Sequence, residues 1–317
     1  MPILRIFAAF CLAAASAVHA QDYPARPLTL VIPFSAGGAA DMVGRILAQK
    51  LTATLGQAVV VSNRPGAGGN IGTEVVARAQ PDGYTLLLTS SAFVINPNLY
   101  AKIPYDALKD FRPVSQPAMM PNVLVVPKSL PVKSVDELVA YGKTHPLSYA
   151  SAGVGTGTHL AGEMFKLATG LDLIHVPYKG GAAANTDLLA GRVALSFATL
   201  PSAIQYIEEG RLLALAMTTA ARWPGLPEAP TMQQAGFKDF DINTWIGLLA
   251  PARTPDAVVQ RLHSEVVRIV REPDVREQFR TLGMLPVADS PAEFGAQISA
   301  ELSMYKKLVD ASGARPD

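Results

Sequence analysis

The stretch "LTLVIPFSAGGAAD", residues 28–41, decides the fold of this chain. It begins as a run of apolar and β-branched residues typical of a buried strand, and the run ends in a Ser-Ala-Gly-Gly turn. A helical pattern follows at once, with Val43, Ile46, Leu47 and Leu51 on one face. Strand, glycine-rich turn and helix form a unit whose free backbone N–H groups bind anions. The stretch therefore predicts an α/β protein with an anion-binding turn.

The same unit recurs along the chain. Residues 28–51 and 58–91 form a first block of strands, glycine-rich loops and helices, and residues 147–170 and 173–202 form a second. Alternating β and α segments imply parallel sheets covered by helices. We therefore predict a two-lobed α/β fold.

The chain is expected to pass between the lobes twice. Val123–Val126 reads as a strand that leaves the first lobe, and "NTWIGLLAP" (243–251) reads as a strand that returns. Two crossings make a hinge, with a cleft between the lobes. The predicted units are a leader (1–20), a first lobe formed by two pieces of the chain (21–122 and 246–317) and a second lobe (123–245).

Residues 1–20 have the pattern of a secretory signal peptide. Arg5 gives a positive start, Ile6–Ala17 is apolar, and "AVHA" (17–20) ends the segment with small residues. The apolar run is too short to span a bilayer. We expect cleavage after Ala20 and export to the periplasm of a Gram-negative cell.

The composition excludes several classes of function. Arg5 and Cys11 lie in the leader, so the mature chain has 26 Lys+Arg, 26 Asp+Glu and no cysteine. Balanced charge provides no basic field for nucleic acid. The lack of cysteine excludes a disulfide framework and thiol chemistry. At 317 residues and 49% hydrophobic, the chain is long enough to bury large cores without disulfides.

Four loops carry the binding chemistry. Open parallel sheets bind ligands at the carboxyl ends of their strands, and the loops 34–41, 89–93, 151–159 and 178–184 lie at such ends. Hydroxyl groups, backbone N–H groups at glycines and helix N-termini all favour a bound carboxylate. We predict a small-carboxylate site without cofactor or metal. The hydroxyl and glycine candidates are Ser35, Gly37, Gly38, Thr89, Ser90, Ser91, Ser151, Gly155, Thr156, Gly157 and Thr158.

Charged residues beside these loops have two readings. Asp41 and Asp187 lie near predicted helix starts, where an acidic side chain favours the helix dipole. If Asp41 faced the cleft instead, it would repel a carboxylate and suit an ammonium or hydroxyl group. Lys179 is either a ligand contact or a surface lysine. His159 and Glu163 have the spacing of half a metal site, but we interpret them as a helix-start histidine and a solvated or paired glutamate.

Motifs for nucleotide binding and catalysis are missing. No stretch supplies a Walker A sequence, and "SAGVGTGTHLAG" (151–162) does not give G-x-G-x-x-G in register. There is no G-x-S-x-G elbow and no H-E-x-x-H. An exported α/β enzyme is the rival hypothesis, and His159 or Asp41 would then be its essential titratable residue.

Five ordered segments carry a family resemblance. They are "PFSAGGAADMVGR", "NRPGAGGNIGTEVVARAQPDGYTLL", "SAGVGTGTHLAGEMF", "HVPYKGGAAANTDLLAGRV" and "WIGLLAPARTPDAVVQRL". Over nearly its whole mature length the chain resembles the Bug family, the periplasmic substrate receptors of tripartite tricarboxylate transporters. The resemblance implies a type II periplasmic binding fold that closes like a Venus flytrap. It also implies carboxylate capture by Phe34, Ser35, Ala36, Gly37 and Gly38, with Thr89, Ser90 and the loop Ser151–His159.

The resemblance implies partners as well. Such receptors deliver their ligand to a permease of one large and one small membrane subunit, and some signal to a sensor kinase. We expect a monomeric receptor rather than an enzyme. Its ligand would be a dicarboxylate, a tricarboxylate, an acidic amino acid or an aromatic acid. A ligand-binding partner of a sensor kinase without a transport role is an alternative that the sequence does not separate.

Overall fold

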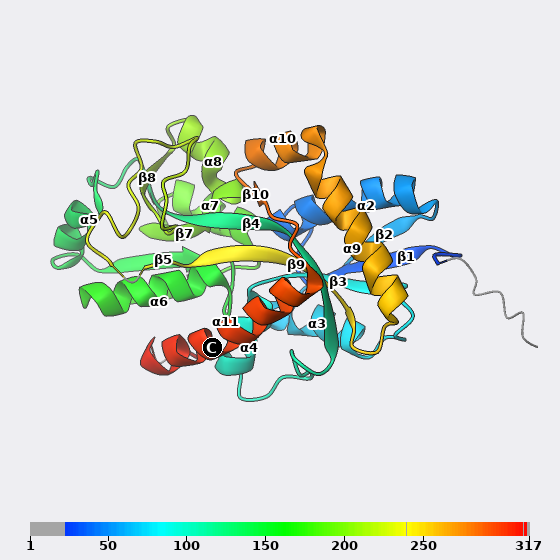
Figure 1. Cartoon of the computed structure of the whole chain (residues 1–317). Helices are drawn as coiled ribbons and strands as arrows, with labels where there is room; N and C mark the ends of the chain where they lie inside the picture. The colour runs from blue at the N-terminus through cyan, green and yellow to red at the C-terminus, as the bar shows by residue number, and fades with distance from the viewer. Residues whose placement is uncertain (1–22, 239, 313, 316–317) are drawn as a thin grey trace, which may run out of the picture.

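The computed structural model describes residues 23–238, 240–312 and 314–315. The predicted leader, residues 1–20, lies outside the described residues. Two α/β halves lie side by side in an elongated molecule (Figure 1). No helix within the described part of the chain is long and apolar enough to cross a membrane.

The first lobe is built on three parallel strands. The opening unit folds as its sequence predicts: a strand of apolar residues is followed by a turn and an amphipathic helix whose buried face includes Val43, Leu47 and Leu51. The strand order is β2-β1-β3, and β9 pairs antiparallel with β3. The elements are β1 (Leu28–Ile32), α2 (Ala39–Leu55), β2 (Val59–Asn63), η2 (Ala67–Gly69), α3 (Asn70–Ala77), β3 (Thr85–Ser90) and α4 (Ala92–Leu99).

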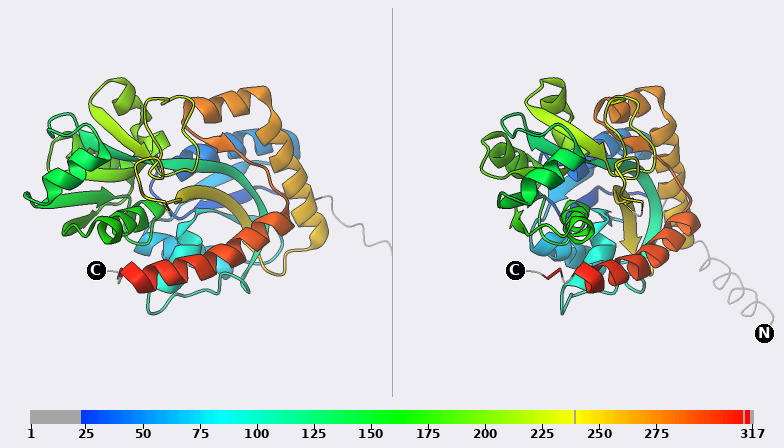
Figure 2. Two further views of the ribbon diagram at one scale, coloured as in Figure 1. Left: turned by 60° about the vertical axis from the view of Figure 1, so that its left-hand side comes forward. Right: turned by 90° about the vertical axis from the view of Figure 1, so that its left-hand side faces the viewer.

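The second lobe repeats this plan. Strand β5 lies between β6 and β7 and is parallel to both, and β7 and β8 each pair antiparallel with β4. The helices contact the strands of this sheet on its two faces (Figure 2). The elements are α5 (Val135–Gly142), β5 (Leu147–Ser151), α6 (Gly157–Thr169), β6 (Leu173–Pro177), α7 (Gly181–Leu189), β7 (Leu195–Thr199), α8 (Leu200–Glu208) and β8 (Leu212–Met217).

Two long strands connect the lobes. Strand β4 (Phe111–Pro127) pairs with β9 (Asn243–Pro251) up to Pro121, and from Asn122 onward it pairs with β7 and β8. Both crossing strands that the sequence predicted are therefore present. Strand β4 is much longer than the predicted Val123–Val126.

Prolines explain why the sequence predicts only a short strand here. Proline lacks a backbone N–H group and is tolerated in strands only at edges and irregularities. In β4 the pairing with β9 shifts register twice, between Pro113 and Ser115 and between Ser115 and Ala118, a stretch that includes Pro117. The strand accommodates Pro113 and Pro117 at these irregularities, and Pro121 lies where the pairing with β9 ends.

Buried polar side chains tie the crossing strands together. The carbonyl oxygen of Asn122 accepts hydrogen bonds from the backbone N and the Oγ1 of Thr218, at 3.0 and 3.1 Å. Thr218 Oγ1 also lies 2.6 Å from the oxygen of Ile242, and Thr244 Oγ1 donates to Asn122 Oδ1 at 3.2 Å. Because buried polar groups need partners, this cluster fixes where the strands leave one lobe for the other.

The C-terminal segment spans both lobes. Its last helix, α11, contacts β4 and α4 and also contacts α6 of the second lobe. The largest apolar cluster accordingly contains Phe93 and Phe294 together with Phe165 and Phe197. The elements are α9 (Asp256–Arg271), α10 (Pro273–Thr281), β10 (Leu285–Pro286) and α11 (Pro291–Ser312).

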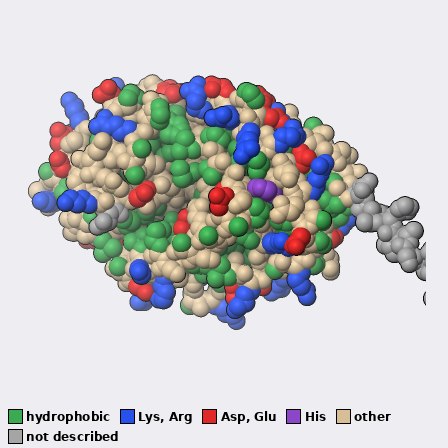
Figure 3. Space-filling view, in the orientation of Figure 1, with side chains coloured by type: hydrophobic (Ala, Val, Ile, Leu, Met, Phe, Trp, Pro, Cys, Tyr) green, Lys and Arg blue, Asp and Glu red, His purple; other side chains and the backbone are tan. Residues whose placement is uncertain are grey.

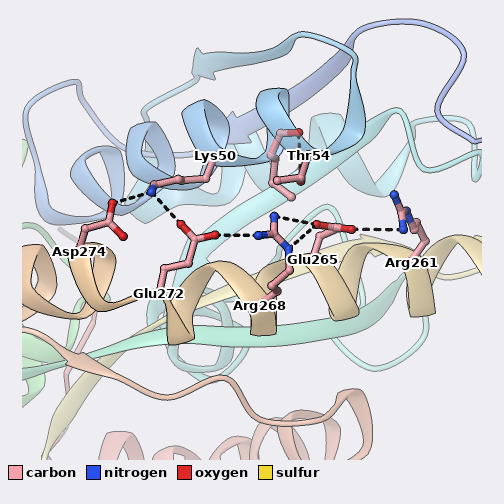
Figure 4. A network of polar contacts seen from close by, with 8 residues as sticks. Lys50, Thr54, Arg261, Glu265, Arg268, Glu272 and Asp274 are labelled. Carbon is pink, nitrogen blue, oxygen red and sulfur yellow. Dashed lines mark hydrogen bonds and ion pairs between the residues drawn. The ribbon is translucent and has the colours of Figure 1, made fainter.

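A ladder of ion pairs joins α2 to α9 and α10 on the outer surface of the first lobe (Figure 4). Lys50 contacts Glu272 at 2.7 Å and Asp274 at 2.5 Å, and Arg268 contacts Glu272 and Glu265 at 2.8 and 3.2 Å. Solvent-accessible pairs of this kind each add little to stability. These ion pairs connect α2 with α9 and α10 across this surface.

Candidate ligand-binding site

The glycine-rich loops of the two lobes converge. An added Cβ at Gly69 would lie 3.4 Å from the Phe34 ring, within the first lobe. An added Cβ at Gly68 would lie 2.8 Å from the carbonyl oxygen of Val154, which belongs to the second lobe. Likewise an added Cβ at Gly157 would lie 3.5 Å from Ser91 Oγ. Three of the four predicted loops thus lie near one another, with the turn Gly66–Gly69 between them.

The first loop is held in place by hydrogen bonds to the buried carboxylate of Asp41. This carboxylate is 2% exposed and accepts hydrogen bonds from Gly37 N at 2.9 Å, Arg45 Nε at 2.8 Å and Asn63 Nδ2 at 3.0 Å. Asn63 also donates to the carbonyl oxygen of Phe34. Burial by itself raises the pKa of Asp41, but these hydrogen bonds and the charge of Arg45 outweigh it, so the pKa is lowered. Asp41 is therefore engaged as an anion within its own lobe.

The rest of this loop offers backbone donors. Gly38 is the N-cap of α2 and no side chain caps it. Ala36 and Gly37 are exposed, and Phe34, Ser35 and Gly38 are half-buried. The first N–H groups of α2 are therefore available to an anion in the manner of a helix N-terminus.

The second loop, between β3 and α4, is buried. Thr89, Ser90 and Ser91 are 1%, 8% and 0% exposed, and Ser90 Oγ accepts from Ala92 N at 3.3 Å. Ser91 Oγ has no hydrogen-bond partner among the described residues. Leaving a buried hydroxyl unpaired costs about 1–3 kcal/mol. Ser91 is therefore the side chain in this loop best placed to gain from a bound ligand.

The third loop is held in shape by hydrogen bonds of its own hydroxyl groups. Thr158 Oγ1 accepts from Ala152 N at 2.9 Å, Thr156 Oγ1 donates to Gly153 O at 2.6 Å, and Ser151 Oγ accepts from Gly153 N at 3.1 Å. Thr156 also caps α6 by accepting from His159 N. The sequence predicted these hydroxyls as ligand donors, and in the structure they shape the loop. The backbone at the start of α6 then supplies donors.

Stacked rings lie behind the third loop. The His159 and His175 rings are 4.2 Å apart, and Tyr149 stacks on His175 at 4.7 Å. Ser151 Oγ lies 2.7 Å from His175 Nε2, and Tyr149 donates to Glu163 at 2.6 Å. Burial, followed by the electrostatic influence of His159 and Lys166, lowers the pKa of His175 to about 3. His175 is therefore neutral over the physiological range.

The fourth loop is held by a different set of contacts. Asp187 accepts from Tyr178 OH at 2.7 Å and pairs with Arg192 at 2.8 Å, and Lys179 is exposed. Glu163, Asp41 and Asp187 all have donors of their own. Within the part of the chain that the structure describes, no three His, Cys, Asp or Glu residues are grouped as a metal site.

Sequence reasoning missed the turn Gly66–Gly69 and its support. Three glycines there have positive φ, at 134°, 63° and 101° for Gly66, Gly68 and Gly69. Asn70 and Asn96 follow them and are buried. The signal was available, because "PGAGGN" (65–70) follows β2 and lies at the same sheet edge as the other loops.

The geometry is that of a two-lobed binder, and the family comparison agrees. Residues 43–314 match the tripartite tricarboxylate transporter family receptors. The chain belongs to this family. Family members are solute-binding receptors, so the predicted resemblance and the two-lobed periplasmic binding fold are confirmed.

Solved structures show the same fold at moderate identity. The chain is similar to an R. palustris protein, Rpa4515, with adipate (37% identity, TM-score 0.90, covering 93% of this chain and 100% of that one). It is similar to the periplasmic binding protein BugD (36%, 0.88, 93% and 100%). It is also similar to MatC from Rhodopseudomonas palustris with bound malate (32%, 0.84, 90% and 100%).

Proposed function

We propose that this protein is a periplasmic receptor that captures a small dicarboxylate between its lobes and delivers it to a tripartite tricarboxylate permease. One observation carries the proposal. The starts of α2, α4 and α6 come from both lobes to one place, and the buried Ser91 hydroxyl there has no protein partner. Two similar structures, with adipate and with malate, hold dicarboxylates, which supports this ligand class.

Neutral donors suffice to bind such a ligand. A helix N-terminus favours an anion by about 0.3–1 kcal/mol, and each hydrogen bond to a charged group contributes about 1.5–3 kcal/mol. Several such contacts, less the cost of association, are compatible with micromolar affinity, about −8 kcal/mol. Asp41 does not oppose this binding, because three donors already surround its carboxylate.

The acidic groups of the site also bear on which acids bind. Asp41 and Glu163 each accept hydrogen bonds from protein donors, so neither is offered as a counter-ion for a ligand ammonium. We infer that acids without an ammonium group bind more tightly than amino acids of the same length. Acidic amino acids, which the sequence left open, become the weaker candidates.

Delivery requires a state that a permease can recognise. We infer that the lobes close about β4 and β9 and bury the ligand, and that the large and small membrane subunits bind this closed form. Acidic and basic side chains are interspersed on the face seen in Figure 3, so a field of a single sign does not dominate this face. Export with cleavage after Ala20 would place the receptor in the periplasm, and N-terminal sequencing of the secreted protein tests that step.

Thermal unfolding against a panel of acids tests the proposed function. The protein is freed of ligand by unfolding and refolding, then heated with adipate, malate, citrate, aspartate, benzoate and the diamide of adipate. An acid at about a hundred times its Kd stabilises the protein by about 2.7 kcal/mol, and its amide has no effect. A shift only with a neutral compound that is then consumed contradicts the receptor and favours the exported enzyme.

A further inference from the structure

Three glycines lie where the two lobes touch. Gly68 of the first lobe faces the carbonyl oxygen of Val154, and Gly155 and Gly157 of the second lobe face Asn96 and Ser91 of the first. At Gly68 and Gly155 the space that a Cβ would occupy is taken by the opposite lobe, whereas at Gly157 the Ser91 hydroxyl lies at ordinary contact distance from that space, 3.5 Å. We name these three contacts the glycine seam.

Asn96 is held rigidly on its side of the seam. It is 1% exposed, and its Nδ2 donates to Gly68 O and to Asn70 Oδ1, both at 2.9 Å. Tyr105 OH donates to the same Asn70 oxygen at 3.0 Å. Asn96 Oδ1 is left without a partner among the described residues and lies against Gly155.

The glycines cannot be replaced without a collision across the lobes. A Cβ on Gly155 would overlap Asn96 Oδ1, and a Cβ on Gly68 would come within 2.8 Å of Val154 O. Real Cβ atoms do not approach a backbone oxygen so closely, and Asn96 has no room to withdraw because its amide nitrogen is bound on the other side. Both glycines also have positive φ, 76° and 63°.

We propose that Gly68 and Gly155 of the glycine seam are positioning residues that set ligand affinity by permitting the lobes to close. The proposal rests on the proposed receptor function. Separation of the lobes breaks the contacts of the seam without disturbing a hydrogen bond within either lobe, whereas closure requires the spaces at Gly68 and Gly155 to be empty. The seam therefore acts on affinity through the closed state, not through contact with the acid.

Matched glycine variants test the seam. Gly155→Ala adds a methyl group at the seam, and Gly170→Ala adds one in the same lobe at nearly the same φ, 68°, with nothing within 4 Å. In the first lobe, Gly68→Ala is compared with Gly56→Ala, which also has φ 68° and open space. The two members of each pair differ in φ by less than about 10°, and only one member collides.

Two readouts separate closure from folding. Adipate affinity is measured by calorimetry, and the interlobe distance is measured between spin labels on Ala53→Cys and Lys143→Cys, two exposed positions in a mature chain without cysteine. We expect Gly155→Ala and Gly68→Ala to bind adipate at least tenfold more weakly and to keep the open distance. The controls Gly170→Ala and Gly56→Ala should bind and close like the wild type.

A rescue completes the test. Gly155→Ala combined with Asn96→Ala removes the oxygen that the methyl group meets, so closure and most of the affinity should return. Binding and closure by Gly155→Ala equal to those of Gly170→Ala overturn the proposal, as does a double variant that stays open although its unfolding temperature is normal. If wild-type protein binds none of the acids of the panel, the proposed function fails; if wild-type binding is unaffected by both seam variants, only the seam fails.

Discussion

The first and third loops of the candidate site are each built from a strand, a turn and a helix, but they are supported in opposite ways. The loop before α2 is partly exposed and depends on one buried carboxylate, Asp41, which has three donors. The loop before α6 is buried and depends on its own threonines and serine. A charge therefore orders the first loop, and neutral hydroxyls order the third. Either support leaves helix N–H groups free for an anion.

The largest effect is expected at Asp41. Asp41→Asn removes the charge and replaces one acceptor oxygen by an amide donor that faces Arg45. Hydrogen bonds to charged groups contribute about 1.5–3 kcal/mol each, so we expect unfolding free energy to fall by about 2–3 kcal/mol in urea. Affinity for adipate should not improve. Tighter binding at unchanged stability would show that Asp41 faces the ligand.

The next effect is expected at Ser91. Ser91→Ala removes a buried hydroxyl that has no protein partner, so the free energy of unfolding should stay the same or rise slightly. Adipate affinity, measured by calorimetry, should fall about tenfold, which corresponds to about 1.4 kcal/mol. Ser299→Ala, on the exposed face of α11, serves as control. A loss of stability with unchanged affinity would remove Ser91 from the site.

Thr158→Val should have a smaller effect than Ser91→Ala and, unlike that variant, should lower the stability of the protein. Thr158→Val removes the oxygen that accepts from Ala152 N and contacts Thr156. We expect a loss of about 1 kcal/mol in unfolding free energy and a parallel loss of affinity, because the third loop loses its shape. Thr186→Val, on the exposed face of α7, should change neither quantity. Equal behaviour of the two variants would mean that the hydroxyls do not order the loop.

A further effect is expected in the pH dependence of stability. The pKa of His175 is about 3 in the folded protein and 6.5 in its ordinary state, so the unfolded chain binds more protons between these values. Unfolding free energy therefore falls as the pH falls below 6.5, by less than about 1.4 kcal/mol per pH unit for one group. His175→Asn should flatten this slope, whereas His145→Asn, at an exposed residue, should not. An unchanged slope in His175→Asn would contradict the burial of this ring.

Local patterns predicted much of this structure. The turn after β1, the helices α2 and α6 and the return along β9 all follow from apolar periodicity and glycine-rich breaks within short windows. Prolines concealed the length of β4, because Pro113 and Pro117 lie at register shifts that only the pairing with β9 reveals. Local sequence patterns predict a helix or strand well when its bounds do not depend on pairing with a distant strand.

The site was predicted less completely, for a related reason. Sequence spacing brought out the hydroxyls of the third loop but not that they bond to one another. Asn96 and the turn Gly66–Gly69 were missed, because their importance arises from contact with a loop far along the chain. A pattern of residues shows which groups are present, and only the fold shows which of them are already occupied.

Calorimetric titration with adipate and with its diamide tests whether neutral donors at the helix starts bind a dicarboxylate. Loops of neutral donors at helix starts should bind the dicarboxylate in a one-to-one complex near micromolar affinity and should not bind the diamide, which lacks the charge that those donors favour. Equal binding of acid and diamide, or binding of neither together with none of the other acids of the panel, would contradict the account.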